Sequence, residues 1–403
     1  MSVPRVLLAT TVVPDDRKTL ACARALAEAG IWVAVGGDAL LGQAYWSRSV
    51  RLRLQYPHPS VDGEGFLAAL NQHVERHEID VVLPMNDSVT LAVSRMKDRL
   101  PRGVHTALPC PDAVEIAADK AKTLALAAQL GIEVPKTFAP QSGEELYAIA
   151  GRIGYPCVLK PNCGSGAIGL SFPANSRELA ESWRRGCRSK HVSGSAYGRG
   201  ASAQMLIQEC VPGETHDVCV IACHGEPRAS LTQHRRWMYP HRGGVGVSVE
   251  STDEPQLRER AHRILAALRW HGPACVEFRV DPKVGRIWLL EINGRLGGAS
   301  AAGIHAGVNY PLLLTRLALD GDIEPVTGYR LEQRFRWPLP FALLALKHRA
   351  PWDVVREFFL PARGVTSDLR WSDPLPHLAE IAFAVRRLSG IGGRGWVVGR
   401  EKT

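Results

Sequence analysis

The sequence predicts a mixed α/β and α+β fold, in which an open parallel sheet comes first and α+β segments follow. Short apolar runs alternate with stretches of helical periodicity from residue 5 to about residue 108, which is typical of consecutive β-α units. After about residue 110 the pattern changes to helices followed by paired strands. The chain has 403 residues, 45% hydrophobic and 22% charged, so it is long and apolar enough for two or three packed domains.

The N-terminal elements are predicted from hydrophobic periodicity. Arg5–Val13 and Ile31–Val35 are short apolar runs, and Lys18–Ala29 between them repeats apolar residues at helical spacing. The alternation continues with helices near Phe66–His77 and Ser88–Leu100 and with strands at Asp80–Pro84 and near Val104–Leu108. The turn after the first strand lacks the Gly-x-Gly-x-x-Gly motif, whose glycines let the backbone of dinucleotide-binding domains come close to a pyrophosphate. We therefore expect a Rossmann-like domain without that cofactor signature.

Polar residues follow one of these strands. Asn86, Asp87 and Ser88 come directly after Asp80–Pro84, at the carboxyl end of the strand, where open sheets bind ligands. Asp-Ser is also a common start of a helix, because its side chains cap the first backbone N–H groups. A ligand-binding role and a helix cap are both compatible with these residues.

Composition and charge exclude several classes of protein. The nine cysteines include no Cys-x-x-Cys pair, which argues against a disulfide framework or a zinc ribbon and fits a reducing compartment. The N-terminus shows neither an export signal nor a membrane span, so we expect a cytoplasmic protein. The sequence is compatible with a homodimer. The net charge of +9 admits anionic ligands, but no block of Lys and Arg indicates a nucleic-acid partner.

A glycine-rich turn follows a predicted strand in the second part of the chain. A helix near Lys122–Leu130 ends at Gly131, and the strand Pro156–Lys160 continues into Pro-Asn-Cys-Gly-Ser-Gly-Ala-Ile-Gly at 161–169. Glycines let the backbone curl and direct its N–H groups at an anion. A flexible hairpin tip is the alternative, and a P-loop is excluded because no Gly-Lys-Ser/Thr follows.

A second hairpin predicts a metal site. Ala274–Asp281 and Arg286–Asn293 alternate in polarity, and a loop at Lys283–Gly285 would place Pro282 opposite Arg286. Glu277 would then face Glu291, and two carboxylates about 5 Å apart repel each other unless a cation joins them. Mg²⁺ accounts for this pair, with Asn293 as a neutral oxygen ligand on the same face. The alternative is that one glutamate is simply solvated.

Together with two lysines, these motifs resemble the ATP-grasp superfamily of carboxylate-amine ligases, which includes carbamoyl-phosphate-synthase-like and D-alanine-ligase-like enzymes. The resemblance covers roughly residues 1–320. It implies a Rossmann-like pre-ATP-grasp domain at 1–110, a two-lobed ATP-grasp domain at 111–323 and a small α+β appendage of unknown role at 324–403. Lys120 in Asp-Lys and Lys160 in Val-Leu-Lys-Pro look like the family's two nucleotide lysines, with Lys122 a close rival of Lys120.

The resemblance also implies the roles of individual residues. Ile207–Glu214 is similar to the segment between the two lobes, where backbone groups read the adenine and Glu214 binds the ribose; many relatives carry glutamate at the position of Gln208. The implied cofactor-binding residues are Lys120, Lys160, Gly164, Ser165, Gly166, Gln208, Glu209, Val211 and Glu214. The implied metal ligands are Glu277, Glu291 and Asn293.

Arginines complete the implied site. Arg295 matches the family's arginine near the transferred phosphate, and Arg235 or Arg236 is expected to hold a substrate carboxylate or phosphate. An ordinary surface ion pair is the alternative for either of the latter two. The histidines His191, His216 and His234 are available as bases, but a lone histidine is more often structural, and a neutral amine needs no protein base.

The activity that the resemblance implies is ATP-dependent ligation of a small-molecule carboxylate to an amine. The γ-phosphoryl group activates the carboxylate as an acylphosphate, and ADP and phosphate are released, with Mg²⁺ or alternatively Mn²⁺ as the metal. A small-molecule kinase on the same scaffold and a non-catalytic ATP-binding regulatory module are the alternatives. Amine-dependent turnover separates the ligase from the kinase.

Loops and the C-terminal part carry fewer signals. Gly243 and Gly244 fit a mobile loop or a plain turn, and Gly186–Gly200 is predicted to be a surface loop. The predicted elements of the appendage are Phe341–Leu346, an amphipathic segment near Trp352–Leu360, a strand at Val365–Trp371 and a helix near Leu378–Leu388. Packing on the preceding domain is the simpler interpretation of this part, and a docking surface for a partner or a membrane interface is the alternative.

Overall fold

A computed structural model describes most of the chain and shows where the predicted elements lie. The described residues are 3–11, 17–39, 42–164, 167–188, 204–239, 242–339, 352 and 364–388. Several predicted features lie outside these residues, namely Ser165, Gly166, His191, most of Gly186–Gly200, Phe341–Leu346 and most of Trp352–Leu360. Among the helices that the model describes, none has both the length and the apolar run needed to cross a membrane.

The N-terminal part is an open parallel sheet, as predicted. Its strand order is β3-β2-β1-β4, with all neighbours parallel. The strands are β1 (Arg5–Ala9), β2 (Trp32–Gly37), β3 (Leu52–Gln55) and β4 (Val81–Pro84), and the helices are α1 (Arg17–Glu28), α2 (Gly63–Arg76) and α3 (Asp87–Arg95). The predicted strand near Val104–Leu108 is reduced to a single bridge between His105 and Val81. Strand β3 was not predicted, because Leu-Arg-Leu-Gln is short and half polar.

The central element is a seven-stranded sheet in the order β12-β11-β8-β9-β10-β13-β14. Its strands are β8 (Glu214–Cys223), β9 (Glu226–Tyr239), β10 (Val245–Thr252), β11 (Gly272–Asp281), β12 (Arg286–Asn293), β13 (Arg334–Arg336) and β14 (Val365–Ser367). The last two strands extend the sheet formed by the earlier ones. The boundaries proposed at residues 110 and 323 remain predictions.

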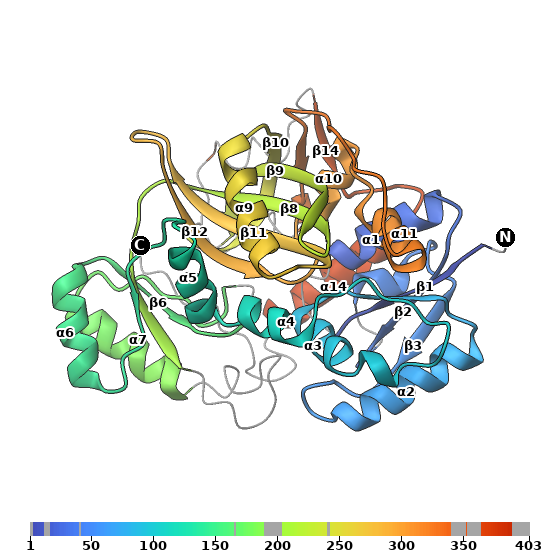
Figure 1. The fold of residues 1–403 in the computed structure, drawn as a ribbon, viewed down its shortest axis with the longest axis horizontal. Helices are drawn as coiled ribbons and strands as arrows, with labels where there is room; N and C mark the ends of the chain where they lie inside the picture. Colours follow the sequence, from blue (N-terminus) through green and yellow to red (C-terminus); the bar gives the residue numbers. More distant parts are fainter. Residues whose placement is uncertain are drawn as a thin grey trace.

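A smaller three-stranded sheet lies at one end of the molecule, and the N-terminal sheet lies at the other (Figure 1). Its strand order is β5-β7-β6, from β5 (Thr137–Phe138), β7 (Met205–Glu209) and β6 (Cys157–Pro161), and its helices are α6 (Gly143–Ile153) and α7 (Ser176–Arg188). The other helices are α4 (Pro111–Ala118), α5 (Lys120–Gln129), α9 (Pro255–Ala267), α10 (Ser300–Ala306), α11 (Tyr310–Asp320) and α14 (Leu375–Leu388). The fold class is therefore the mixed α/β and α+β class that the sequence predicts.

The two faces of the central sheet belong to different cores. Val218 and Val220 of β8 face the core that contains α5 and α9, whereas Cys219 and Ile221 face the core that contains α1 and α11. Alternation along the strand causes this division, because successive side chains of a strand point to opposite faces. The same alternation decides which polar side chains share a face further along the sheet.

The hairpin of β11 and β12 is confirmed, but its register is not uniform. Near the turn Asp281 pairs with Arg286, whereas the sequence predicted that Pro282 would do so. A β-bulge between Glu277 and Phe278 then shifts the pairing by one residue, so that Glu277 faces Glu291 as predicted. A bulge places two residues of one strand opposite one residue of the other. The predicted turn was one residue too short, and the bulge restores the carboxylate pair.

Strand β14 and helix α14 pack against the N-terminal part through a buried carboxylate. Asp373 accepts hydrogen bonds from Arg24 Nε at 2.9 Å, Ser47 Oγ at 2.6 Å and the Arg48 amide at 3.0 Å. The sequence favoured packing on the preceding domain. Strands β13 and β14 do extend the central sheet, whereas α14 contacts the N-terminal part. Trp371, however, is 99% exposed beside this contact.

Replacing Asp373 by asparagine is expected to lower the free energy of unfolding by about 2 kcal/mol, because hydrogen bonds to a charged group weaken. Burial opposes ionisation of this carboxyl, but the bonds from Ser47, Arg48 and Arg24 hold its pKa below the usual value. A lowered folded-state pKa stabilises the fold at neutral pH, and this stabilisation is lost as the pH falls through it. Urea denaturation at several pH values should therefore show the two proteins converging in acid, and a constant difference would contradict this account.

Candidate functional site

The carboxylates of the hairpin converge on one amide. Glu277 on β11 and Glu291 on β12 face each other, and the Asn293 side-chain nitrogen lies 3.1 Å from Glu277 Oε1 and 3.2 Å from Glu291 Oε1. The bulge and the strand alternation together bring these three side chains to the face of the sheet opposite Val276 and Phe278. The predicted metal ligands therefore lie together.

Both predicted nucleotide lysines approach this group. Lys120 lies at the first turn of α5, is buried, and donates from Nζ to the Gly164 carbonyl at 2.6 Å, with Glu291 Oε2 at 3.4 Å. Lys160 is buried on β6. Lys122 is exposed on the same helix as Lys120. The geometry thus favours Lys120 over its rival, because only Lys120 is directed at the carboxylates.

The charges of this group are strongly coupled. Burial disfavours the ionised form of Glu291, but Lys120 and Lys160 outweigh burial and hold its pKa at about 2. Burial raises the pKa of Glu277 to about 7, although Arg235 opposes the rise. Burial also lowers the pKa of Lys160 to about 8, against the attraction of Glu291. The pKa values of the two facing carboxylates are therefore shifted in opposite directions.

Arg235 is held by two carboxylates. Its guanidinium donates to both oxygens of Asp217, at 2.8 and 2.6 Å, and lies 2.7 Å from Glu277 Oε1. Arg236, its neighbour in sequence, instead donates to Glu250 Oε2 at 2.6 Å and is exposed. Of the two arginines expected to hold a substrate, the structure brings only Arg235 to the metal set, and there it neutralises protein carboxylates.

Arg295 connects the metal set to the N-terminal part. It donates from Nη2 to Asn293 Oδ1 at 2.8 Å, and its Nε lies 3.2 Å from Asp87 Oδ1. Burial opposes its charge, but Asp87 raises the pKa of this arginine. Asn86, not Asp87, caps α3, since its side chain accepts from the Val89 amide at 3.1 Å. The helix-cap interpretation therefore holds for Asn86, whereas Asp87 pairs with an arginine of the site.

The remaining predicted residues lie outside this group. Gln208 is buried on β7 and donates to Thr137 Oγ1 at 2.6 Å, Glu209 accepts from the Lys136 amide at 3.3 Å, and Val211 is buried. Glu214 lies on the other face of β8 from Asp217, where it is 3.1 Å from His234 Nε2. Within the described residues, a cavity at the centre is lined by Asp87, Lys120, Gly164, Glu291 and Asn293.

The histidines His216 and His234 stack on each other away from the metal set. Their rings are 4.6 Å apart at an angle of 14°, on the face of the sheet that carries Glu214. Burial lowers the pKa of His216 to about 4, and the charge of His234 adds to this effect. Neither contacts the carboxylate pair, which agrees with the structural role that the sequence favoured for lone histidines.

Asp217 is the residue of this site that the sequence did not indicate as functional. It is almost fully buried, and it accepts from Gln233 Nε2 at 3.2 Å in addition to Arg235. The available signal was a charged residue inside an otherwise apolar strand, His-Asp-Val-Cys-Val-Ile. Such a residue must find a partner on its own face of the sheet, because an unpaired buried charge is too costly.

The donor set suits a hard divalent cation. Glu277 and Glu291 offer carboxylate oxygens, which are ligands that Mg²⁺ takes in proteins. The Asn293 amide turns its nitrogen to these carboxylates and its oxygen to Arg295, so it would have to rotate to offer its oxygen to a cation. A cation at this point would also favour the ionised form of both carboxyls. With two lysines and Arg295 nearby, the site can hold a polyanion together with its metal.

Comparison with known proteins supports one family over about half of the chain. The family model described as the carbamoyl-phosphate synthase L chain, ATP binding domain, matches residues 119–322, slightly more than half of the sequence. The carbamoyl phosphate synthase large chain of Vibrio cholerae serotype O1 is 24% identical over 285 residues, which are 63% of this chain and 24% of that protein. The chain thus spans about a quarter of the length of that relative.

Solved structures share the fold at low sequence identity. A biotin carboxylase from Campylobacter jejuni has a TM-score of 0.64 and 18% identity, and the match covers 83% of this chain and 74% of that one. The N5-carboxyaminoimidazole synthetase of Staphylococcus aureus in complex with ADP also has a TM-score of 0.64, with 13% identity over 87% of each chain. At such identities the likeness concerns the fold alone.

Proposed function

Because the chain belongs to the ATP-grasp superfamily, through the family of carbamoyl-phosphate synthase L chain ATP-binding domains, we propose that it is an ATP-dependent carboxylate-amine ligase. The reaction would pass through an acylphosphate and release ADP and phosphate. The observation that carries this proposal is the convergence of Glu277, Glu291 and Asn293 with Lys120, beside a cavity that Lys120, Glu291 and Asn293 line.

Phosphoryl transfer needs positioning and charge neutralisation more than a protein nucleophile. Lys120 and Lys160 provide two buried positive charges beside Glu291, where the phosphates of ATP would lie. Mg²⁺ held by Glu277, Glu291 and Asn293 would supply further positive charge to the phosphate oxygens. Arg295 adds a third cationic side chain, and its contact with Asp87 fixes the direction of its guanidinium.

Arg235 has a different role in this proposal from the one expected from the sequence. Its guanidinium already faces Asp217 and Glu277, so it holds Glu277 in place as a positioning residue. Arg236 lies outside the site, and we propose no substrate contact for it. We still assign the nucleoside of ATP to Glu214 and to the β7 segment at Gln208–Glu209. Glu214 lies on the other face of β8.

Further parts of the proposal rest on the sequence. We propose that Mn²⁺ can replace Mg²⁺, that the substrates are small molecules, and that the protein acts in the cytoplasm. A homodimer is compatible with this proposal. The domain limits 1–110, 111–323 and 324–403 belong to the same proposal.

Nucleotide turnover by the purified chain tests the function. With Mg²⁺, ATP and pools of small carboxylates and amines, we expect ADP, not AMP, and we expect its formation to need both pools. Formation of ADP with carboxylates alone would instead indicate a kinase. Binding of ATP without turnover under any pool would contradict ligation by this chain.

A further inference from the structure

Three potential metal ligands meet at the far end of the central sheet, away from the site described above. Cys223 ends β8, and His271 directly precedes β11. These strands are antiparallel, with Gly272 paired to Ala222, so the same register places His271 opposite Cys223. Cys223 lies six residues along β8 from Asp217, which corresponds to about 20 Å at the rise of an extended strand.

The third ligand comes from the turn between β8 and β9. His224 and Gly225 form this turn, with Cys223 paired to Glu226 and positive φ angles of 50° and 101° at the two turn residues. The Gly225 amide donates to the Trp270 carbonyl at 2.7 Å, which fixes the turn against the segment that carries His271. The backbones that carry the three side chains are therefore held together by the sheet and by this bond.

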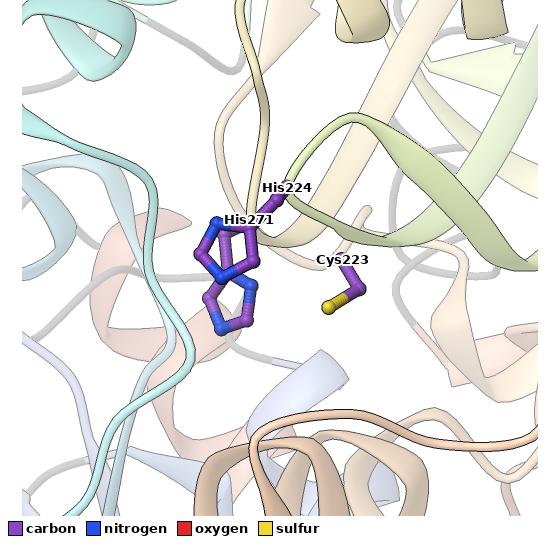
Figure 2. A group of neighbouring side chains, drawn as sticks. All are labelled: Cys223, His224 and His271. Carbon is purple, nitrogen blue, oxygen red and sulfur yellow. The ribbon is translucent and has the colours of Figure 1, made fainter.

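The side chains lie close enough to share one ion. One nitrogen of each histidine and the Cys223 sulfur are all within 4.8 Å of one another. The imidazole rings of His224 and His271 stack at 4.5 Å with an angle of 24° (Figure 2). His271 Nδ1 is buried and makes no hydrogen bond to any described residue, although buried polar atoms are normally paired.

We propose that Cys223, His224 and His271 form a binding site for one zinc ion. One thiolate and two imidazoles are ligands that Zn²⁺ prefers, and water can complete a tetrahedral set. Binding would break the S–H bond of Cys223, and the proton would leave to solvent as the Zn–S bond forms. Magnesium would not compete, because Mg²⁺ takes oxygen ligands.

Only small movements are required. Zinc lies about 2.3 Å from sulfur and about 2 Å from nitrogen, so the ligands of a tetrahedral site are roughly 3.3–3.5 Å apart. The ligand atoms here, which lie within 4.8 Å of one another, must approach by up to about 1.5 Å. Stacked rings direct their lone pairs side by side, and one ring must turn for both to reach the same ion. His224 is exposed and can turn, whereas Cys223 is buried and donates to the Gly321 carbonyl at 3.5 Å.

Cobalt titration of the full-length chain tests the site directly. After removal of metals with a chelator and without nucleotide, one equivalent of Co²⁺ should produce a near-ultraviolet thiolate-to-cobalt charge-transfer band, and one equivalent of Zn²⁺ should remove it. The C223S variant should lack the band. The H271A variant should bind Zn²⁺ at least about 100-fold more weakly, because it loses a direct ligand.

Matched controls separate this site from other thiols and histidines. Cys110 is an exposed cysteine elsewhere, and His73 and His77 form another stacked pair, so the C110S and H77A variants should keep the band. The H224N variant guards against misfolding, because asparagine tolerates a positive φ, and it should bind Zn²⁺ at least about 10-fold more weakly. No band in the natural chain, an undiminished band in C223S, or unchanged zinc affinity in H224N would overturn the proposal.

Discussion

Replacing Arg235 by methionine is expected to lower the free energy of unfolding by about 3–5 kcal/mol, which is typical when one partner of a buried ion pair is removed. The guanidinium is the shared partner of Asp217 and Glu277, and Asp217 is only 1% exposed. Without it, two carboxylates would face each other on the same side of the sheet with one fewer positive charge. Urea denaturation of the purified variant at neutral pH measures the loss.

Arg236 provides the matched control, because it is the next residue in the chain and makes an ion pair of the same length. Arg236 is itself exposed, and its partner Glu250 keeps a second ion pair with Arg334, so loss of this bond should cost about 0–1 kcal/mol. The R236M variant should therefore be nearly as stable as the natural protein. A loss of stability in R235M as small as that in R236M would show that Asp217 and Glu277 find another partner.

Replacing Glu291 by glutamine is expected to reduce turnover by at least about 1,000-fold while the fold is kept. The substitution removes a charge that we propose as a metal ligand, which faces Glu277 and lies 3.4 Å from Lys120, and such electrostatic contacts stabilise transition states by several kcal/mol. The variant should also be less stable, because Lys120 and Lys160 lose the carboxylate that they attract and relief of repulsion from Glu277 offsets only part of this loss. ADP formation and a thermal melt of the same sample measure both quantities.

A glutamate between α5 and β5, which contacts the same hairpin from outside, serves as a control. Glu133 pairs with Arg286 at the start of β12, and both side chains are exposed. The E133Q variant should retain turnover, since this pair lies outside the site. Activity retained in E291Q would remove Glu291 from the metal ligands, and activity lost in both variants would indicate damage to the hairpin.

The parts of the fold that follow from local pattern could be predicted from the sequence. The parallel N-terminal sheet is encoded by the alternation of apolar runs and helical periodicity, which needs no information from distant residues. The carboxylate pair could be predicted because a hairpin brings Glu277 and Glu291 together through a short loop. Local geometry therefore accounts for the carboxylate pair and Asn293, whereas the lysines and arginines of the predicted site came from the family resemblance.

The contacts that the sequence did not predict join residues far apart in the chain. Arg235 and Arg236 are adjacent and chemically alike, and only the pairing of β8 with β9 decides which of them faces Asp217. The ion pair between Asp87 and Arg295 joins the N-terminal sheet to the end of β12, and no periodicity reports such a contact. Long-range packing, rather than residue type, determines these partners.

The bulge in the β11–β12 hairpin makes the site tolerant of a change in strand length. From the turn, the register set by Asp281 and Arg286 would bring Leu290 opposite Glu277, and the bulge brings Glu291 there instead. A chain that lacks one residue before Glu291 would reach the same pairing with a regular ladder, because both arrangements put the glutamate on the same face. A one-residue gap at this point in an alignment of related chains would therefore mark the loss of the bulge and not the loss of the carboxylate pair.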